Sequence, residues 1–271
     1  MTHANDELVE IARSAALAAG ELVGAKRAQG VAVAALKSSP VDVVTEADRE
    51  SEELIRSLLA DARPGDGFFG EESGEGDAST TGVTWVVDPI DGTVNYLYDI
   101  PQYAVSIAAV EGGSDPAEWT ALAGVVVNPA LGEVYSATRG GGAFLGGRQL
   151  HVTAGKELAQ ALVATGFSYT AERRGRQAAA VARLIPLIRD IRRQGSAALD
   201  LCAVAAGRTD AYYERGLHPW DHAAGALIAA EAGARVAGLR GAPATELFTL
   251  AAEPGLFEQL EPLLEQFGAA R

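Results

Sequence analysis

The segment WVVDPIDGTVNY, residues 85–96, places two carboxylates three positions apart at the end of an apolar run. Asp88 follows residues typical of a buried strand, where an unpaired charge is costly. Asp91 is followed by Gly92, which lets the main chain come close to a ligand, and by Thr93, which opens a predicted short helix. The first amides of a helix can hold a phosphate group. The segment therefore combines acids suited to a metal ion with amides suited to phosphate.

Each acidic motif also has an ordinary structural explanation when it is taken alone. Residues 91–92 can be a simple Asp-Gly turn, and Glu71 with its neighbour Glu72 can belong to a solvated acidic loop. Asp221 can be a first-turn helix acid, and Asp48 can close a capping box. The individual motifs leave both interpretations open.

The order of the motifs is more specific than any one of them. Along the chain follow KSSPVDVVTEAD (37–48), GEES (70–73), DPIDGT (88–93), GSAALDLC (195–202) and YYERGLHPWDHAAG (212–225). This series closely resembles the inositol monophosphatase family of magnesium-dependent, lithium-sensitive phosphatases. The resemblance runs from about Lys37 to Gly233, and only small differences occur, such as Ser196 where some members have threonine.

The resemblance implies the metal ligands. It assigns a first Mg²⁺ to Glu71, Asp88 and the backbone carbonyl of Ile90, and a second to Asp88, Asp91 and Asp221. A third, weaker ion is held in this family mainly through water and the residue that matches Glu71.

The resemblance also implies catalytic and substrate-binding residues. The catalytic set comprises Asp48, Thr93 and Glu71, with Thr93 and Asp48 orienting and deprotonating the attacking water. The amides of Gly92 and Thr93 match the phosphate cradle. The family positions that contact the hydroxyl groups of the substrate match Asp91, Gly195, Ser196, Ala197 and Glu214. Lys37 matches a family position near the site.

Elementary electrostatics agrees with a metal site. Two negative charges 4 Å apart repel by roughly 4 kcal/mol at an effective dielectric constant of about 20, so several converging carboxylates need cations to stay ionised. Oxygen ligands without His or Cys favour Mg²⁺ or Mn²⁺ over zinc. Paired ions lower the pKa of a bound water and stabilise a leaving alkoxide. The expected cofactor is therefore Mg²⁺, two to three ions, with Mn²⁺ as a substitute.

Composition limits the remaining possibilities. The chain has 271 residues, is 48% hydrophobic and carries a formal net charge of −14, which opposes broad binding to nucleic acid or anionic membranes. Its one cysteine, Cys202, excludes an internal disulfide and fits a reducing compartment. The N-terminal sequence shows the pattern of neither a signal peptide nor a membrane span. We therefore expect a cytoplasmic protein.

The periodicity of apolar residues predicts the elements that position these motifs. A first helix has an apolar face from Leu8 to Leu22, a possible cap at Asn5 or Asp6, and an end at Gly30. A second helix starts at Thr45, residues 63–82 are mostly loop, and 84–87 form a strand. Residues 103–150 have the pattern of a largely antiparallel sheet. After residue 160, strands and helices alternate, with a closing helix from about Pro254.

This change of pattern predicts two subdomains. Residues 1–152 form an N-terminal α+β subdomain with the metal site, and residues 153–271 form an α/β subdomain that closes it. The resemblance implies a layered α-β-α-β-α sandwich and a homodimer.

The expected reaction is hydrolysis of a small phosphate monoester of a polyol, with myo-inositol 1-phosphate favoured. Relatives with the same fold use histidinol phosphate, fructose 1,6-bisphosphate or 3'-phosphoadenosine 5'-phosphate, so these remain alternatives. A regulatory interaction protein that keeps the fold is another. An all-oxygen metal site does not need His218 or His222, so we expect both to have a structural or surface role. Cys202 is expected to lie in the core on an apolar helix. The basic string at 172–176 is typical of a solvated helix face, although it could attract phosphate.

Overall fold

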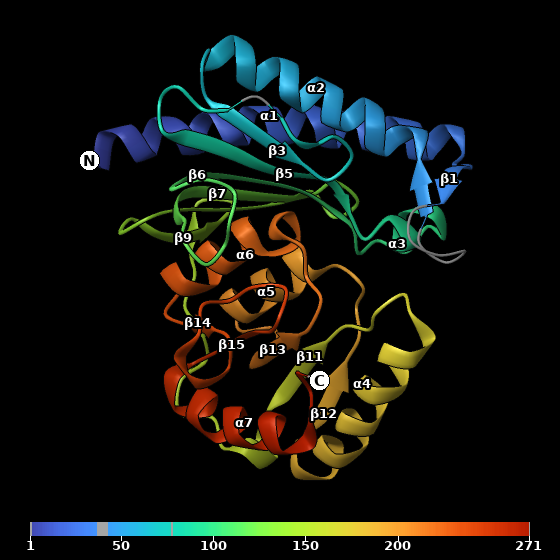
Figure 1. Ribbon diagram of the computed structural model, residues 1–271, viewed down its shortest axis with the longest axis vertical. Coiled ribbons are helices and arrows are strands. Elements are labelled where there is room, and N and C mark those ends of the chain that lie inside the picture. Colours follow the sequence, from blue (N-terminus) through green and yellow to red (C-terminus); the bar gives the residue numbers. More distant parts are fainter. Residues whose placement is uncertain (1, 37–42, 77, 271) are drawn as a thin grey trace.

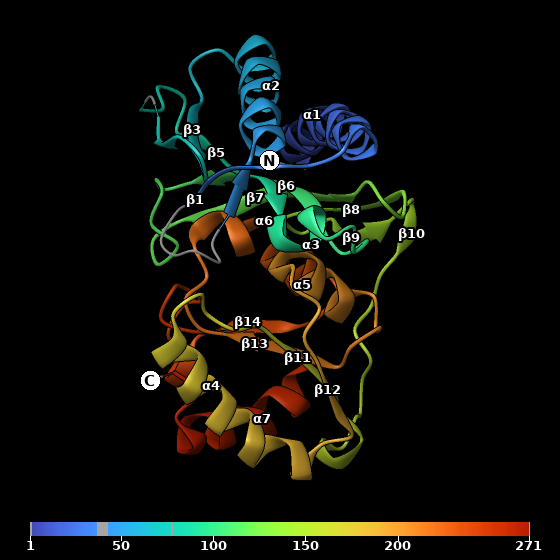
Figure 2. The ribbon, with the colours of Figure 1, turned by 90° about the vertical axis from the view of Figure 1, so that its right-hand side faces the viewer.

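The computed structural model describes residues 2–36, 43–76 and 78–270, which form five layers stacked along the long axis of the molecule (Figure 1). Helical layers alternate with β-sheets in the order helix, sheet, helix, sheet, helix (Figure 2). This is the layered α/β sandwich that the family resemblance implied.

The first layer consists of two helices, α1 (Thr2–Gln29) and α2 (Glu46–Ala62), which cover the outer face of the larger sheet. Ala12, Ala15, Ala16 and Ala19 of α1 are buried at helical spacing. Because alanine has a short side chain, this face of the helix can approach the strands closely.

The larger sheet has the strand order β10-β9-β8-β7-β6-β5-β3-β4. Its neighbouring strands are antiparallel except for β3 and β5, which are parallel. The strands are β3 (Gly67–Gly70), β4 (Gly74–Glu75), β5 (Val83–Asp91), β6 (Ala104–Glu111), β7 (Thr120–Asn128), β8 (Glu133–Thr138), β9 (Gly142–Leu145) and β10 (Arg148–Gln149). The antiparallel sheet expected over residues 103–150 is confirmed.

The middle layer consists of α5 (Ala197–Ala205) and α6 (Pro219–Glu231), which come from the second half of the chain. Both pack against the larger sheet and share one hydrophobic cluster with it, in which Val126 of the sheet lies with Cys202 and Ala224 of the two helices. Cys202 is fully buried there, as the sequence indicated. The division into subdomains at residues 152 and 153 stays a prediction.

The smaller sheet lies beyond these helices, with the order β12-β11-β13-β15-β14. Its outer face is covered by α4 (Ala171–Leu184) and α7 (Pro254–Phe267) (Figure 2). Its strands are β11 (Leu162–Thr165), β12 (Asp190–Arg192), β13 (Ala211–Glu214), β14 (Arg235–Ala237) and β15 (Thr249–Ala252). The alternation of strands and helices and the closing helix at Pro254 are confirmed.

Short elements complete the fold. β1 (Val33–Leu36) pairs with β2 (Val43–Thr45), and α3 (Thr93–Leu97) is the short helix predicted after the acidic motif. Single turns of 3₁₀ helix lie at Leu158–Gln160, Ile185–Leu187 and Leu239–Gly241.

Two local predictions were wrong, the cap of the first helix and the end of the strand expected at 84–87. The first helix has no cap at residue 5 or 6, because it already begins at Thr2 and both residues lie inside it. Residues 63–82 are mostly loop, as expected, although they also contain the two short strands β3 and β4, and β3 pairs in parallel with β5. Finally, the strand expected at 84–87 continues to Asp91, so the turn comes at Gly92.

Candidate active site

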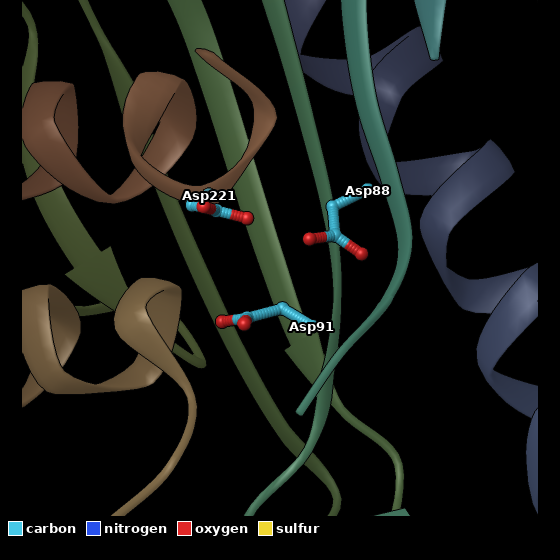
Figure 3. A group of neighbouring side chains, drawn as sticks. All are labelled: Asp88, Asp91 and Asp221. Carbon is cyan, nitrogen blue, oxygen red and sulfur yellow. The ribbon is translucent and has the colours of Figure 1, made fainter. Parts of the chain in front are cut away.

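Two elements from distant parts of the sequence bring three carboxylates together. Asp88 and Asp91 lie on β5, and Asp221 lies in the first turn of α6 (Figure 3). One carboxylate oxygen from each residue lies within 4.8 Å of those of the other two. Asp88 and Asp91 are buried, and Asp221 is partly buried.

A bulge in β5 explains how two acids three residues apart share one face. In a regular strand, such residues would point to opposite sides of the sheet. Asp88 pairs with Ser106 and Asp91 pairs with Ala104, so three steps on β5 match two steps on β6. The extra residue turns both side chains toward α6.

Hydrogen bonds hold each acid in place. An oxygen of Asp88 accepts the amide of Ile90 at 3.0 Å, and an oxygen of Asp221 accepts the amide of His218 at 2.7 Å. Asp91 Oδ2 accepts both the Ser196 hydroxyl at 2.6 Å and the Ala198 amide at 2.7 Å. These hydrogen bonds fix the position of each carboxylate at the place where the three acids meet.

Burial and mutual repulsion disfavour the charged state of these acids. Burial, followed by the charges of Glu71 and Asp91, raises the pKa of Asp88 well above its ordinary value. Burial likewise raises the pKa of Asp91 to about 6, and burial with the charge of Asp91 raises the pKa of Asp221. A divalent cation would relieve this cost, and the oxygen donors suit Mg²⁺. The residues present thus fit a metal site.

Asp48 and Thr93 form a buried pair beside the three acids. The Thr93 hydroxyl lies 3.1 Å from Asp48 Oδ1 and also 3.1 Å from the carbonyl oxygen of Ile90. Asp48 Oδ2 accepts the Thr45 amide at 2.8 Å and the Thr45 hydroxyl at 2.5 Å, so the carboxylate caps α2 as well. Burial raises the pKa of Asp48 to about 7, which suits proton transfer near neutrality.

Gly92 occupies a position that another residue would not fit. Its φ is 92°, in the left-handed region. A Cβ at this position would lie 2.9 Å from the carbonyl oxygen of Gln102 and 3.1 Å from that of Gly195. Glycine therefore allows the β5 turn to approach the segment that begins α5.

Glu214 ends β13 and reaches the same cavity from the smaller sheet. The Tyr212 hydroxyl donates to Glu214 Oε2 at 2.7 Å, and a Cβ at Gly166 would overlap the carboxylate. Burial raises the pKa of Glu214 to about 7, although the charge of Arg193 opposes this rise.

Nearly all of the predicted site residues line one cavity of about 390 Å³, a size typical of small-molecule sites. Those in its wall are Glu71, Asp88, Ile90, Asp91, Gly92, Thr93, Gly195, Ser196, Ala197, Glu214 and Asp221. Asp48 is reached through Thr93. Lys37 lies outside the residues that the structure describes.

Several residues that the sequence analysis did not select also belong to this region. Asp200 is buried in the cavity wall and accepts a hydrogen bond from Gln194 at 2.8 Å. The sequence feature that could have identified Asp200 is its position as the single acid in an otherwise apolar helix. Glu52 of α2 is buried, and its Oε2 accepts the Glu72 amide at 2.8 Å, next to Glu71. No local pattern marks Glu52, because its partner lies on a distant loop.

The two histidines beside Asp221 differ in environment. His222 is buried, and burial lowers its pKa to about 4. His218 is exposed, and its ring stacks on Trp220 with centroids 5.0 Å apart. Trp220 in turn meets Phe69 of β3 edge to face at 5.3 Å, so this aromatic contact links the Glu71 loop to α6.

Comparison with known proteins identifies relatives over almost the whole chain. A model of the inositol monophosphatase family matches residues 4–267. Inositol-1-monophosphatase SuhB of Mycobacterium tuberculosis is 50% identical over 260 residues, which cover 91% of this chain and 87% of that protein. Nus factor SuhB of Escherichia coli is 39% identical and covers 86% of each chain.

Solved structures agree with the sequence relatives. The crystal structure of the extragenic suppressor protein suhB from Bartonella henselae matches with a TM-score of 0.88 at 36% identity, covering 96% of this chain and 98% of that one. Within the described part of this chain, no helix has the length and apolar character needed to cross a membrane.

Proposed function

Because the chain belongs to the inositol monophosphatase family and is therefore a phosphatase, we propose that it hydrolyses small phosphate monoesters, with myo-inositol 1-phosphate as the favoured substrate. The observation that carries this proposal is the group formed by Asp88, Asp91 and Asp221, whose oxygens lie within 4.8 Å of one another at a cavity wall. The M. tuberculosis and other relatives named inositol-1-monophosphatase support the choice of substrate.

The proposed metal ligands come from the family resemblance, and the grouping of Asp88, Asp91 and Asp221 supports them. Glu71, Asp88 and the carbonyl of Ile90 would hold one Mg²⁺, and Asp88, Asp91 and Asp221 would hold another. A third ion would be held more weakly, through water and Glu71. When bound, the metal ions supply positive charge that activates water and stabilises the leaving alkoxide. The raised pKa values of Asp88 and Asp221 support this role, because only a cation makes their joint ionisation favourable.

Thr93 and Asp48 would remove a proton from the attacking water. Water would donate its proton to the Thr93 hydroxyl while that hydroxyl passes its own proton to Asp48 Oδ1, 3.1 Å away. Oxygen of the water then bonds to phosphorus as the bond from phosphorus to the ester oxygen breaks. A pKa of about 7 lets Asp48 accept a proton at neutral pH.

Substrate would be held at both ends of the cavity. The amides of Gly92 and Thr93 would bind phosphate, while Asp91, Glu214 and the segment 195–197 would meet the hydroxyl groups of the polyol. Lys37 stays a predicted contributor near the site.

A phosphate-release assay tests the proposal directly. We expect turnover of inositol 1-phosphate in Mg²⁺, none in excess chelator, and inhibition by Li⁺ at concentrations where Na⁺ has no effect. Full activity in the chelator would refute metal catalysis. The same assay should include histidinol phosphate, fructose 1,6-bisphosphate and 3'-phosphoadenosine 5'-phosphate. A higher kcat/KM for one of these compounds would make that compound, rather than inositol 1-phosphate, the favoured substrate.

A regulatory role is the second candidate, and the name of the E. coli relative, Nus factor SuhB, favours it. The set of acids argues that regulation is not the sole role, because a pure binding protein does not need it. An inactive Asp88→Asn variant that still performed the regulatory task would separate the two roles.

Assembly and location complete the proposal. A homodimer is expected, and sedimentation would show its mass. A cytoplasmic location is compatible with Cys202, a buried free thiol.

A further inference from the structure

Asn95 of α3 holds together three segments of the chain beside the candidate active site. Its side chain is 6% exposed, and its Nδ2 donates to two backbone carbonyl oxygens, that of Gln102 at 2.7 Å and that of Gln194 at 2.8 Å. Gln102 lies shortly before β6, whereas Gln194 lies 99 residues further along the chain than Asn95, shortly before α5. One buried amide group therefore uses both of its N–H donors to join α3 to the loop before β6 and to the segment before α5.

Two glycines allow these segments to approach each other closely. Gly195 directly follows Gln194 and has a φ of 94°, and a Cβ there would lie 2.8 Å from Asn95 Nδ2. Gly92 lies on the other side, where a Cβ would come within 3.1 Å of the carbonyl oxygen of Gly195. Because a side chain at either position would push the backbones apart, this contact and the Asn95 hydrogen bonds set the distance between the turn at Gly92 and the segment before α5.

The segments that Asn95 joins carry different parts of the proposed substrate site. The amides of Gly92 and Thr93 are proposed to bind phosphate, and the segment 195–197 is proposed to meet the hydroxyl groups of the polyol. Both segments line the same cavity, whereas Asn95 is not among the residues of its wall. A change at Asn95 would therefore act on a substrate only through the positions of these two segments.

We propose that Asn95 is a positioning residue for substrate selection, which sets the spacing between the phosphate-binding turn at Gly92 and the polyol-binding segment 195–197. A polyol phosphate has to contact both segments at once, so its kcat/KM depends on this spacing. An aryl phosphate has no hydroxyl groups for the segment 195–197 and depends on the phosphate-binding turn and the metal ions alone. This inference rests on the proposed function, because it assigns a further determinant of specificity to the same site.

Asn95→Asp tests this role, because aspartate has the shape of asparagine but, when ionised, cannot donate to the two carbonyl oxygens. An oxygen facing those carbonyls should let the segment 194–195 move away from α3, whereas the bonds from Ser196 and Ala198 to Asp91 remain available. The ratio of kcat/KM for inositol 1-phosphate to kcat/KM for phenyl phosphate should fall by about tenfold. The fall should come mainly from a higher KM for inositol 1-phosphate, with inhibition by inorganic phosphate unchanged.

Asn128→Asp is the matched control. Asn128 is also buried, and its Nδ2 donates to the carbonyl oxygen of Pro101 at 3.2 Å, next to Gln102. In the described part of the chain, Asn128 forms no hydrogen bond to the segment 194–195. This variant removes a buried donor from the same loop, so it should lower the unfolding temperature without changing the ratio of the two kcat/KM values.

Three outcomes would overturn the inference. They are an unchanged ratio in Asn95→Asp, an equal loss of kcat/KM on both esters, and an equal fall of the ratio in Asn128→Asp. If Asn95→Asp does not fold, Asn95→Ser takes its place, because serine adds no charge and its hydroxyl can donate only one hydrogen bond. The same three outcomes then apply to Asn95→Ser.

Failure of the proposed function would be recognised separately, because the wild-type protein would then hydrolyse neither ester. Calorimetric titrations with inositol 1-phosphate and with inorganic phosphate, both in Mg²⁺, would test the inference in that case. Asn95→Asp should bind inositol 1-phosphate about tenfold more weakly than wild type and inorganic phosphate equally well. An unchanged ratio of the two affinities would overturn the inference.

Discussion

The cavity has two walls that differ in how their charged groups are held. The acidic wall, formed by β5 and α6, carries Asp88, Asp91 and Asp221, each fixed by hydrogen bonds. The outer wall, formed by α4 and the end of β13, carries Glu214 and two arginines without partners among the described residues. Because the acidic wall is held rigidly and would bind metal, it should serve every substrate alike. The outer wall should distinguish one substrate from another.

The largest expected effect comes from the acidic wall. Asp88→Asn removes the charge shared by both proposed metal sites and should abolish hydrolysis of inositol 1-phosphate and of a simple aryl phosphate equally. In chelator the same variant should unfold at a temperature no lower than wild type, because repulsion among the remaining acids falls. Activity above a few per cent of wild type on either ester would mean that Asp88 does not bridge two ions.

The second-largest expected effect comes from Glu214 in the outer wall. Glu214→Ala should weaken kcat/KM for inositol 1-phosphate by on the order of 2 to 4 kcal/mol, the value of one or two charge-assisted hydrogen bonds. An aryl phosphate, which has no ring hydroxyls, should be hydrolysed almost as before. Glu214→Gln is the control for packing, since it can still accept the Tyr212 hydroxyl. Equal losses of kcat/KM on both esters would mean that Glu214, like the acidic wall, serves every substrate alike.

A smaller effect concerns the support behind the acidic wall. The buried carboxylate of Glu52 accepts the Glu72 amide, and a Cβ at Gly70 would overlap it, so it fixes the loop that carries Glu71. Glu52→Gln should raise the Mg²⁺ concentration for half-maximal activity by about tenfold, as loss of an outer partner does in metal sites. Glu53→Gln, on the exposed side of α2, is the control. An unchanged Mg²⁺ dependence in Glu52→Gln would contradict the role of Glu52.

The smallest effect is a pH dependence of stability without metal. The folded-state pKa of Asp91 is raised to about 6 and that of Asp48 to about 7, both above the ordinary value of 3.8. Protonation of these groups therefore favours the folded state, and this stability is present below about pH 4 and is lost as pH rises toward 7. In chelator, we therefore expect the unfolding temperature to fall between about pH 4 and pH 7. Saturating Mg²⁺ should reduce this dependence of the unfolding temperature on pH. An unchanged dependence would mean that the titrating groups do not belong to the metal site.

The sequence predicted the acidic wall better than the outer wall. Asp88, Asp91 and Asp221 stand in short motifs whose order is specific, so their meeting at one cavity was expected. The bulge in β5 was not, because its register is set by pairing with β6 rather than by local residues. The strand at 67–70 was missed for the same reason, since parallel pairing with β5 gives a short apolar run no distinctive pattern. Arg173, which lines the outer wall of the cavity, could not be separated from its neighbours Arg174 and Arg176 until the position of α4 against the turn at Gly216 was known.

The packing of α5 and α6 against the larger sheet has a consequence for the order of folding. The Ala198 amide reaches Asp91 across 107 residues of sequence, and Asp221 joins the same group from still farther along the chain. Contacts of such high sequence separation close large loops and form slowly. During refolding, the local helices should therefore appear well before phosphatase activity, which has to wait until the second half of the chain has docked on the first.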